Sequence, residues 1–251
     1  MNIGVAQIPN TSSHETNLAN IVEALKTHSE QGSELVIFPE CALSGYSPAL
    51  LKCEAELLAN LLASVKDTCK RNSIAALVPT LTFRGKDRLN SVVLISEAGE
   101  ELERFFKIGF TPTDEKIFSQ VEHHSRSFNF KGFNIGVLIC AEISDDPWKY
   151  LDRDTKYDAI VWPGMWGWRD DLDWKDPKPS NGLEIIESVS SWETCLIQAN
   201  FSETEGMPYP AGFGGGRSFV INKDKSIAIE GPKNKQANLF LSLSKHGCQQ
   251  R

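Results

Sequence analysis

The chain has 251 residues, of which 41% are hydrophobic and 24% charged, and its 33 acidic and 26 basic side chains give a net charge of −7. This balance, without any lysine- or arginine-rich block, argues against a nucleic acid partner. No apolar run approaches the roughly 20 residues that cross a bilayer, and the amino terminus does not resemble a signal peptide, so we expect a cytoplasmic protein that contacts no membrane.

The first part of the chain is typical of strands alternating with helices. Apolar residues recur at helical spacing from Ser13 until Gly32 ends the segment. Ser47 and Pro48 are typical of the N-cap and first turn of a second helix, which we expect to reach about Cys69. Strands are predicted over residues 3–8, 34–38, 74–79, 80–83, 91–96 and 102–106, with hairpin turns at 84–88 and 97–100.

The second part continues in the same way after an irregular polar segment that follows residue 107. Strands are predicted over 127–130, 134–139, 158–162, 195–199, 218–222, 226–230 and 239–243, with a helix over 180–192. No composition shift, linker or internal repeat divides this series. The sequence therefore predicts a single α/β domain, with parallel and antiparallel neighbours in its sheets.

Six cysteines are present, and their spacing shows no pairing. A chain of this length needs no disulfide staples, so we expect free thiols. A buried cysteine is usually a small apolar filler, and a chemical role needs support from its surroundings. No cysteine and histidine group has the spacing of metal ligands, so no metal site is predicted.

Three predicted strands end on a chemically reactive side chain. The strand at 35–39 stops at Glu40, the strand at 102–106 stops at Lys107, and the strand before Cys140 stops at that cysteine. Because an α/β domain gathers strand ends along one edge of its sheets, these three residues are expected to meet.

Together the three residues would supply a nucleophile, a base and a cation. An unperturbed thiol, with a pKa near ~8.5, is mostly protonated at neutral pH and needs a base such as Glu40 to become a nucleophile. Addition of Cys140 to a carbonyl or nitrile carbon creates an anion, for which Lys107 and the backbone N–H of Ala141 are candidate donors. Glu40 would then protonate a departing amine and activate the water that cleaves the thioester.

Four motifs carry these residues in a definite order. They are Val36-Ile-Phe-Pro-Glu40 with Leu43-Ser-Gly-Tyr46, Phe105-Phe-Lys107 with Glu115, Gly136-Val-Leu-Ile-Cys140-Ala-Glu142, and Gln198-Ala-Asn200. On these motifs the chain resembles the nitrilase, or carbon–nitrogen hydrolase, superfamily over nearly its full length, in its amidase-like branch. The resemblance implies a four-layer α-β-β-α sandwich, a homodimer, and hydrolysis of non-peptide C–N bonds without a cofactor.

The resemblance also implies a role for each site residue. Glu40 would be the general base and acid, Lys107 the electrostatic stabiliser and Cys140 the nucleophile. Glu115 would be an accessory carboxylate that orients Lys107 or the substrate amine; the alternative is a solvated acid at a helix start. Tyr46, Ala141 and Trp166 are expected to line the substrate pocket.

Departures from the family pattern concern the substrate. Many amidase-like relatives carry an aromatic residue after the cysteine and an arginine shortly beyond, where this chain has Ala141 and Ser144. A small residue opens the pocket, and a substrate carboxylate would need another cation, such as Arg169 or Arg217. Cyanide-hydrolysing members commonly carry tryptophan next to the cysteine, so its absence favours a small amide or carbamoyl substrate over a nitrile.

Other features leave alternatives open. The glycine-rich 212–217 segment precedes a strand and lacks a phosphate-loop ending, which favours a flexible loop near the site over a nucleotide site. His123 or His124 would complete a protease-like dyad with the cysteine, although its surroundings lack such a signature.

Glu142 is better explained by a structural role. A non-catalytic binding module with the same fold is the alternative to an enzyme.

Three tryptophans, Trp162, Trp166 and Trp168, follow a predicted buried strand whose end faces the same edge as the cysteine. They would either wall a small pocket or pack the loop onto the core or onto a second subunit, and the sequence favours neither.

Overall fold

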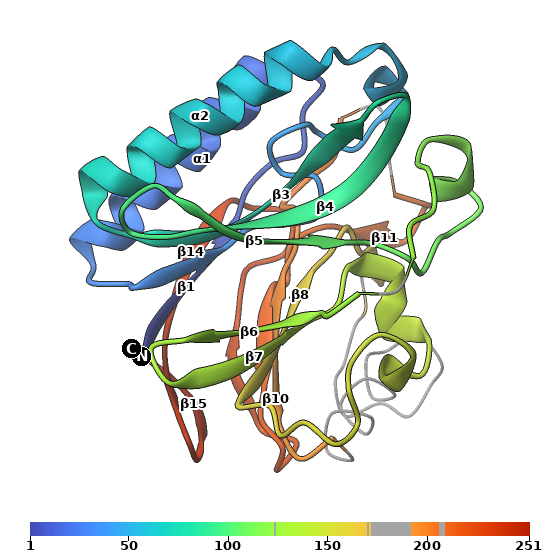
Figure 1. Cartoon of the computed structure of the whole chain (residues 1–251). Helices are drawn as coiled ribbons and strands as arrows, with labels where there is room; N and C mark the ends of the chain where they lie inside the picture. Colours follow the sequence, from blue (N-terminus) through green and yellow to red (C-terminus); the bar gives the residue numbers. More distant parts are fainter. Residues whose placement is uncertain (123, 170, 172–191, 206–208) are drawn as a thin grey trace.

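The computed structural model describes residues 1–122, 124–169, 171, 192–205 and 209–251. In this part of the chain two mixed β-sheets pack face to face (Figure 1). The seven-stranded sheet contains, in spatial order, β15 (Gly247–Gln250), β14 (Ala237–Ser244), β1 (Asn2–Gln7), β2 (Leu35–Ile37), β3 (Ala75–Arg84), β4 (Asp87–Ile95) and β5 (Glu101–Phe106).

The six-stranded sheet contains, in spatial order, β13 (Ile227–Glu230), β12 (Phe219–Ile221), β10 (Cys195–Ala199), β8 (Ala159–Pro163), β7 (Phe133–Val137) and β6 (Ser127–Phe130). A short ribbon pairs β9 (Trp168–Arg169) with β11 (Phe213–Gly214). The central strands of each sheet run parallel and the outer ones antiparallel, so the predicted mixture is confirmed.

Two helices, α1 (His14–Glu30) and α2 (Ala55–Asn72), lie side by side on the outer face of the seven-stranded sheet (Figure 1). Ser13 caps α1 by accepting a hydrogen bond from the backbone N–H of Thr16. Each helix buries one apolar face, including Leu25 of α1 and Val65 of α2. Among the described residues, no helix has the length and apolarity that a bilayer span requires.

Besides the layer under the two helices, the interior has one layer between the sheets and one on the outer face of the six-stranded sheet. Between the two sheets, alternate residues of facing strands interdigitate, among them Val5, Leu77 and Val161. On the opposite face, an aromatic cluster surrounds Trp162 and packs near two short 3₁₀ segments, η3 (Cys140–Ser144) and η4 (Pro147–Lys149). The layers therefore run helices, sheet, sheet, and a mixed outer layer.

The predicted strand boundaries hold at β6 and β10, and two local expectations are wrong. Ser47 and Pro48 open a separate 3₁₀ segment, η1 (Pro48–Lys52), and α2 starts only at Ala55. The predicted strands 74–79 and 80–83 form one strand, β3. The proline inside β3 is tolerated because β2 pairs only with Ala75–Leu77, so no ladder partner needs the missing N–H.

The predicted helix over 180–192 lies largely outside the described residues, and the hairpin strand β15 was not predicted.

One buried titratable group makes the stability of the fold pH-dependent. His28, in the last turn of α1, is fully buried with its ring against Gly4, where an added Cβ would come within 2.3 Å of the ring. Burial lowers the pKa of His28 to about 4. The unfolded chain, with a histidine pKa near 6.5, therefore takes up a proton that the folded protein excludes.

Lowering the pH from 7 to 5 should accordingly reduce the free energy of unfolding by about 2 kcal/mol through His28 alone. Urea unfolding at the two pH values measures this difference. A His28→Asn variant should lose that part of the pH dependence, whereas the exposed His246→Gln control should keep it. An unchanged pH dependence in His28→Asn would contradict the assignment.

Candidate active site

The structure brings the three strand-end side chains together. Glu40 follows β2, Lys107 follows β5 directly, and Cys140 follows β7, so the group joins both sheets. Lys107 Nζ lies 2.8 Å from Glu40 Oε1, and the Cys140 thiol lies close enough to the Glu40 carboxylate for this charge to raise the pKa of the thiol. Glu40 and Lys107 are each 1% exposed, and Cys140 is 8% exposed. A thiol, a carboxylate and an ammonium therefore share one buried site.

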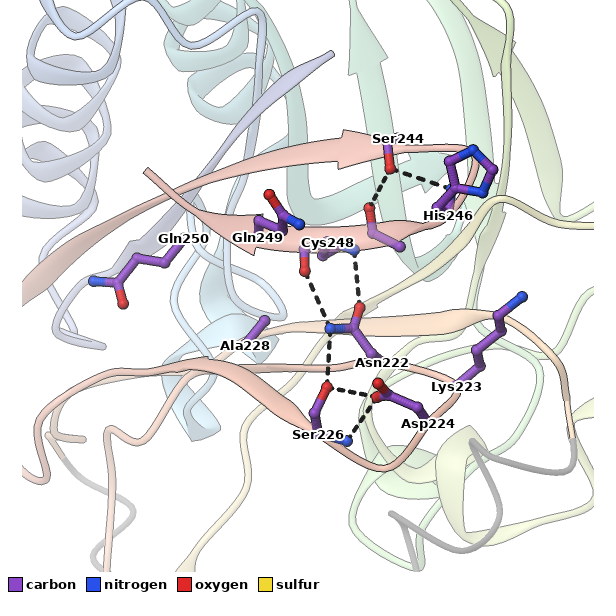
Figure 2. Close-up of a pocket in the computed structure, with 11 residues that line it drawn as sticks. Asn222, Lys223, Asp224, Ser226, Ala228, Ser244, His246, Cys248, Gln249 and Gln250 are labelled. Carbon is purple, nitrogen blue, oxygen red and sulfur yellow. Dashed lines mark hydrogen bonds between the residues drawn. The ribbon is translucent and has the colours of Figure 1, made fainter.

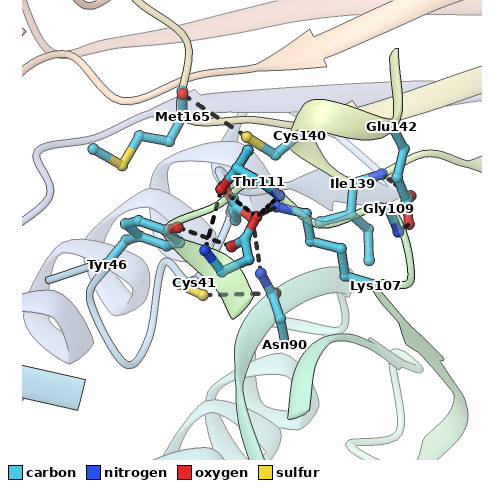
Figure 3. A network of polar contacts seen from close by, with 12 residues as sticks. Cys41, Tyr46, Asn90, Lys107, Gly109, Thr111, Ile139, Cys140, Glu142 and Met165 are labelled. Atoms are coloured by element: carbon cyan, nitrogen blue, oxygen red, sulfur yellow. Dashed lines mark hydrogen bonds and ion pairs between the residues drawn. The ribbon is translucent and has the colours of Figure 1, made fainter. Parts of the chain in front are cut away.

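Cys140 stands at a sharp backbone turn. It is the first residue of η3 and has a φ of +48°, in the left-handed region that a non-glycine residue adopts only when its surroundings impose it. The indole Nε1 of Trp162 donates to the Cys140 carbonyl at 2.9 Å. The thiol lies 3.9 Å from the Met165 carbonyl oxygen (Figure 3). The turn and these contacts fix the direction of the sulfur.

Glu142 ties this turn to the segment that carries the lysine. Its Oε2 accepts the backbone N–H of Ile139 at 2.7 Å, and its Oε1 accepts those of Ile108 and Gly109 at 2.9 and 3.1 Å (Figure 3). The Arg126 guanidinium neutralises both oxygens, at 2.6 and 3.1 Å, and both side chains are completely buried. Glu142 has the structural role favoured by its sequence context, and Arg126 is a partner that the sequence did not reveal.

A second carboxylate contacts the lysine, and it belongs to Asp114. Asp114 Oδ2 lies 2.8 Å from Lys107 Nζ and accepts the backbone N–H and the hydroxyl of Thr111, both at 2.8 Å. The Tyr46 hydroxyl donates to Asp114 Oδ1 at 2.8 Å. Tyr46, expected in the substrate pocket, is thus buried and holds this carboxylate.

Glu115, expected as the accessory carboxylate, is not brought to the other three residues. Its side chain is exposed, while its neighbour Asp114 is fully buried. Both residues belong to the one-turn 3₁₀ segment η2 (Asp114–Lys116), where consecutive side chains point about 120° apart. Only one of two adjacent acids can face Lys107, and the Thr111 hydrogen bonds select Asp114.

Asn90 is a site residue that the sequence did not reveal. It is buried in β4, and its Nδ2 donates to Glu40 Oε1 at 2.8 Å. Its Oδ1 lies 3.6 Å from the Cys41 sulfur (Figure 3). Glu40 Oε1 therefore receives hydrogen bonds from both Asn90 and Lys107. The available signal was an amide side chain shortly before the apolar run that begins at Val92.

The charges set the resting protonation states. Burial raises the pKa of Glu40, and the Lys107 ammonium offsets this only in part. Burial also raises the pKa of the Cys140 thiol, and the neighbouring Glu40 carboxylate raises it further. Burial works against a charged Lys107, but Glu40 and the other anionic neighbours outweigh it and keep the pKa of this lysine raised. The resting site holds a neutral thiol beside a base that can accept its proton.

The three tryptophans pack against one another in the aromatic cluster, which agrees with the packing alternative, and they differ in exposure. Trp162 and Trp168 are buried and pack edge-on with Phe219 in the aromatic cluster. Trp166 is partly exposed, and Asn200 holds its backbone from both sides, accepting from its N–H and donating to its carbonyl, each at 2.8 Å. Trp166 and Ala141 are both partly exposed, and their contact with a substrate stays a prediction.

The rival features find other partners. His124 Nε2 accepts the backbone N–H of Phe106 at 2.9 Å, and His123 lies outside the described residues. In the glycine-rich segment, a Cβ on Gly215 would lie 2.7 Å from the carbonyl oxygens of Phe201 and Ser202. The glycines here allow close backbone packing.

Adjacent residues give a matched test of the accessory carboxylate. Asp114→Asn removes a negative charge from Lys107 and should lower kcat by roughly 10- to 1000-fold. Glu115→Gln makes the same chemical change at the surface and should leave kcat within about twofold. Steady-state kinetics of the two variants decides between them. Equal losses in both, or a loss in Glu115→Gln alone, would contradict the assignment.

Known proteins resemble this chain in sequence. A family model described as carbon-nitrogen hydrolase matches residues 2–146. The glutamine-dependent NAD(+) synthetase of Synechocystis is 30% identical over 158 residues, which cover 57% of this chain and 28% of that protein. Its counterpart from Acinetobacter baylyi is 23% identical over 241 residues, covering 93% of this chain and 42% of that protein. The chain spans less than half the length of these curated relatives.

Solved structures extend the likeness to nearly the whole chain. One is a mutant of the amidase from Nesterenkonia sp. AN1 with acrylamide added at its active-site cysteine. It has a TM-score of 0.82 at 19% sequence identity, and the aligned region covers 97% of this chain and 93% of the amidase chain. The glutamine-dependent NAD+ synthetase of Acinetobacter baumannii has a TM-score of 0.81 at 20% sequence identity, and the aligned region covers 96% of this chain and 45% of the synthetase chain. The shared architecture is the expected α-β-β-α sandwich, in a single α/β domain.

Proposed function

Because the chain belongs to the carbon–nitrogen hydrolase family, we propose that it hydrolyses the C–N bond of a small amide through a thioester on Cys140 and releases ammonia. The observation that carries the proposal is the buried contact of Lys107 with Glu40, 2.8 Å apart, beside the cysteine thiol. A purely structural ion pair would have no need of a thiol held in a left-handed backbone turn.

Acylation begins with proton transfer from the thiol to Glu40. The thiolate attacks the amide carbonyl carbon, and the resulting oxyanion is stabilised by the Lys107 ammonium and the backbone N–H of Ala141. That N–H lies in the first turn of η3, where amides have no partner within the helix. Glu40 then gives its proton to the leaving nitrogen, the C–N bond breaks and ammonia departs.

Deacylation repeats the same steps with water. Glu40, again a carboxylate, removes a proton from water as the oxygen attacks the thioester carbon. The C–S bond breaks, the sulfur regains its proton and the carboxylic acid leaves. The raised pKa of Glu40 suits a group that must both accept and return a proton near neutral pH.

A short neutral amide is the favoured substrate. The two arginines considered for gripping a substrate carboxylate are engaged elsewhere: Arg169 lies 2.9 Å from Asp171, and Arg217 lies 2.6 Å from Glu230. The amidase from Nesterenkonia, whose structures carry acrylamide or an acetamide group, supports a small amide. Glutamine is the second candidate, because the curated relatives are glutamine-dependent enzymes.

A substrate panel tests the proposal. Ammonia release is measured with propionamide, glutamine, an N-carbamoyl amine and propionitrile. We expect propionamide to have the highest kcat/KM. A preference for glutamine would make the second candidate the substrate. A preference for the carbamoyl compound or the nitrile would overturn the amide assignment, and no ammonia from any of the four compounds would favour a non-catalytic binding module.

A further inference from the structure

We propose that Cys195 and Cys248 form a second thiol site, which small disulfide compounds convert to an intramolecular disulfide that fastens the two sheets together. The pair lies apart from the amide-hydrolysing residues, and the proposal does not depend on that reaction. No metal or cofactor is involved.

The two thiols are held against each other across the sheet interface. Cys195 begins β10 in the six-stranded sheet, and Cys248 belongs to β15 in the seven-stranded sheet. Their sulfur atoms are 3.0 Å apart, and each residue is 2% exposed. The sulfurs lie in the apolar layer between the sheets, so joining them would require only a small approach.

The backbone around Cys248 is fixed to the opposite sheet as well. Asn222, which follows β12, accepts the N–H of Cys248 at 2.8 Å and donates to its carbonyl at 3.1 Å (Figure 2). These two hydrogen bonds clamp β15 onto the six-stranded sheet. The hydrogen bonds from the Asn222 side chain to the Cys248 backbone therefore hold the Cys248 sulfur opposite Cys195.

A route for a reagent exists beside Cys248. This residue lines a surface pocket of about 450 Å³ together with polar residues such as Asn222, Ser226 and Gln249 (Figure 2). β15 is also the edge strand of its sheet, paired only with β14 on one side. Brief opening of an edge strand costs less than opening of a central one, so the thiol can be reached from this pocket.

The chemistry balances with a small disulfide as the oxidant. The Cys248 thiolate attacks one sulfur of the compound, its S–S bond breaks, and one thiol product leaves. The Cys195 thiolate then attacks the Cys248 sulfur of the mixed disulfide and expels the second thiol product. Two protein thiols are oxidised to one S–S bond, and the compound is reduced to two thiols that carry the two protons.

Cystamine tests the proposal on the intact native protein. After incubation, remaining thiols are blocked with N-ethylmaleimide in denaturant and the protein is digested with trypsin without reduction. Cys195 and Cys248 fall in separate tryptic peptides, 176–217 and 246–251, and neither holds another cysteine. We expect the two peptides to appear cross-linked, with the loss of two hydrogens, and the melting temperature to rise by roughly 5–15 °C.

Matched variants assign the cross-link to these two sulfurs. Cys248→Ala and Cys195→Ala should each abolish the cross-link, and either variant suffices if the other does not fold. Cys69, buried in α2, serves as the internal control and should be recovered fully alkylated by N-ethylmaleimide. Recovery of both peptides alkylated separately, a stable mixed disulfide on Cys248, or a cross-link to a different cysteine would each overturn the proposal.

Discussion

Replacing Cys140 with alanine should reduce amide hydrolysis by a factor on the order of 10⁴ or more. In the proposed mechanism the Cys140 thiol forms the covalent intermediate. Glu40 and Lys107 are committed to each other at 2.8 Å, and the neighbouring thiol of Cys41 is fully buried beside Asn90, so neither the ion pair nor Cys41 should replace it. Ammonia release by the native protein and the variant, followed with the best substrate of the panel, measures the loss.

The matched control for this variant is Cys69→Ala, which removes a buried thiol from α2, away from the site. It should keep kcat and lose only about 1 kcal/mol of stability. Circular dichroism and thermal melting must show that Cys140→Ala is folded. A folded Cys140→Ala protein with more than a few per cent of the native rate would refute the assigned nucleophile.

Glu40→Gln should lower kcat by roughly 10²- to 10⁴-fold, because the amide cannot accept the thiol proton or return it to the leaving nitrogen. The substitution keeps the size of the side chain and a carbonyl oxygen for the Asn90 and Lys107 donors. The thiol itself remains, so slow alkylation of Cys140 by acrylamide should still occur. Loss of both alkylation and hydrolysis would indicate a disturbed fold in place of a missing base.

The pH profile gives an independent test of the same carboxylate. Glu40 works as a base only when ionised, so kcat/KM should fall as the pH drops through its pKa. Because burial raises that pKa, the acid limb should lie above the usual glutamate range near 4.3. An acid limb at or below that range would contradict the environment seen here. The residual activity of Glu40→Gln should lack this limb.

The convergence of Glu40, Lys107 and Cys140 could be predicted because each side chain ends a recognisable strand. Strand ends meet at a sheet edge, so position in the chain already restricts position in space. The partners that complete the site were harder to find. Asn90 lies within a strand, and Arg126 lies in an irregular segment, so neither has a pattern that distinguishes it from an ordinary polar residue.

The choice between Asp114 and Glu115 shows a second limit of sequence reasoning. Two adjacent acids in a polar segment look alike, and the difference is made by the phase of a single 3₁₀ turn and by the Thr111 hydrogen bonds. The fold shows the same limit at Pro79, where two predicted strands, 74–79 and 80–83, form one strand. The short length of β2 explains why the strand continues instead.

The most direct test of the account is to trap the acyl group on the protein during turnover. Native protein and the Glu40→Gln variant are each mixed with the best amide substrate of the panel, quenched in acid and digested with trypsin. The mass of peptide 132–149, which holds Cys140 and no other cysteine, is then measured by mass spectrometry. We expect this peptide to gain the mass of the substrate acyl group, and hydroxylamine to remove that group as it does from a thioester. Acylation of a different residue, or turnover with no acyl group on this peptide under conditions where deacylation is slowed, would contradict the proposed mechanism.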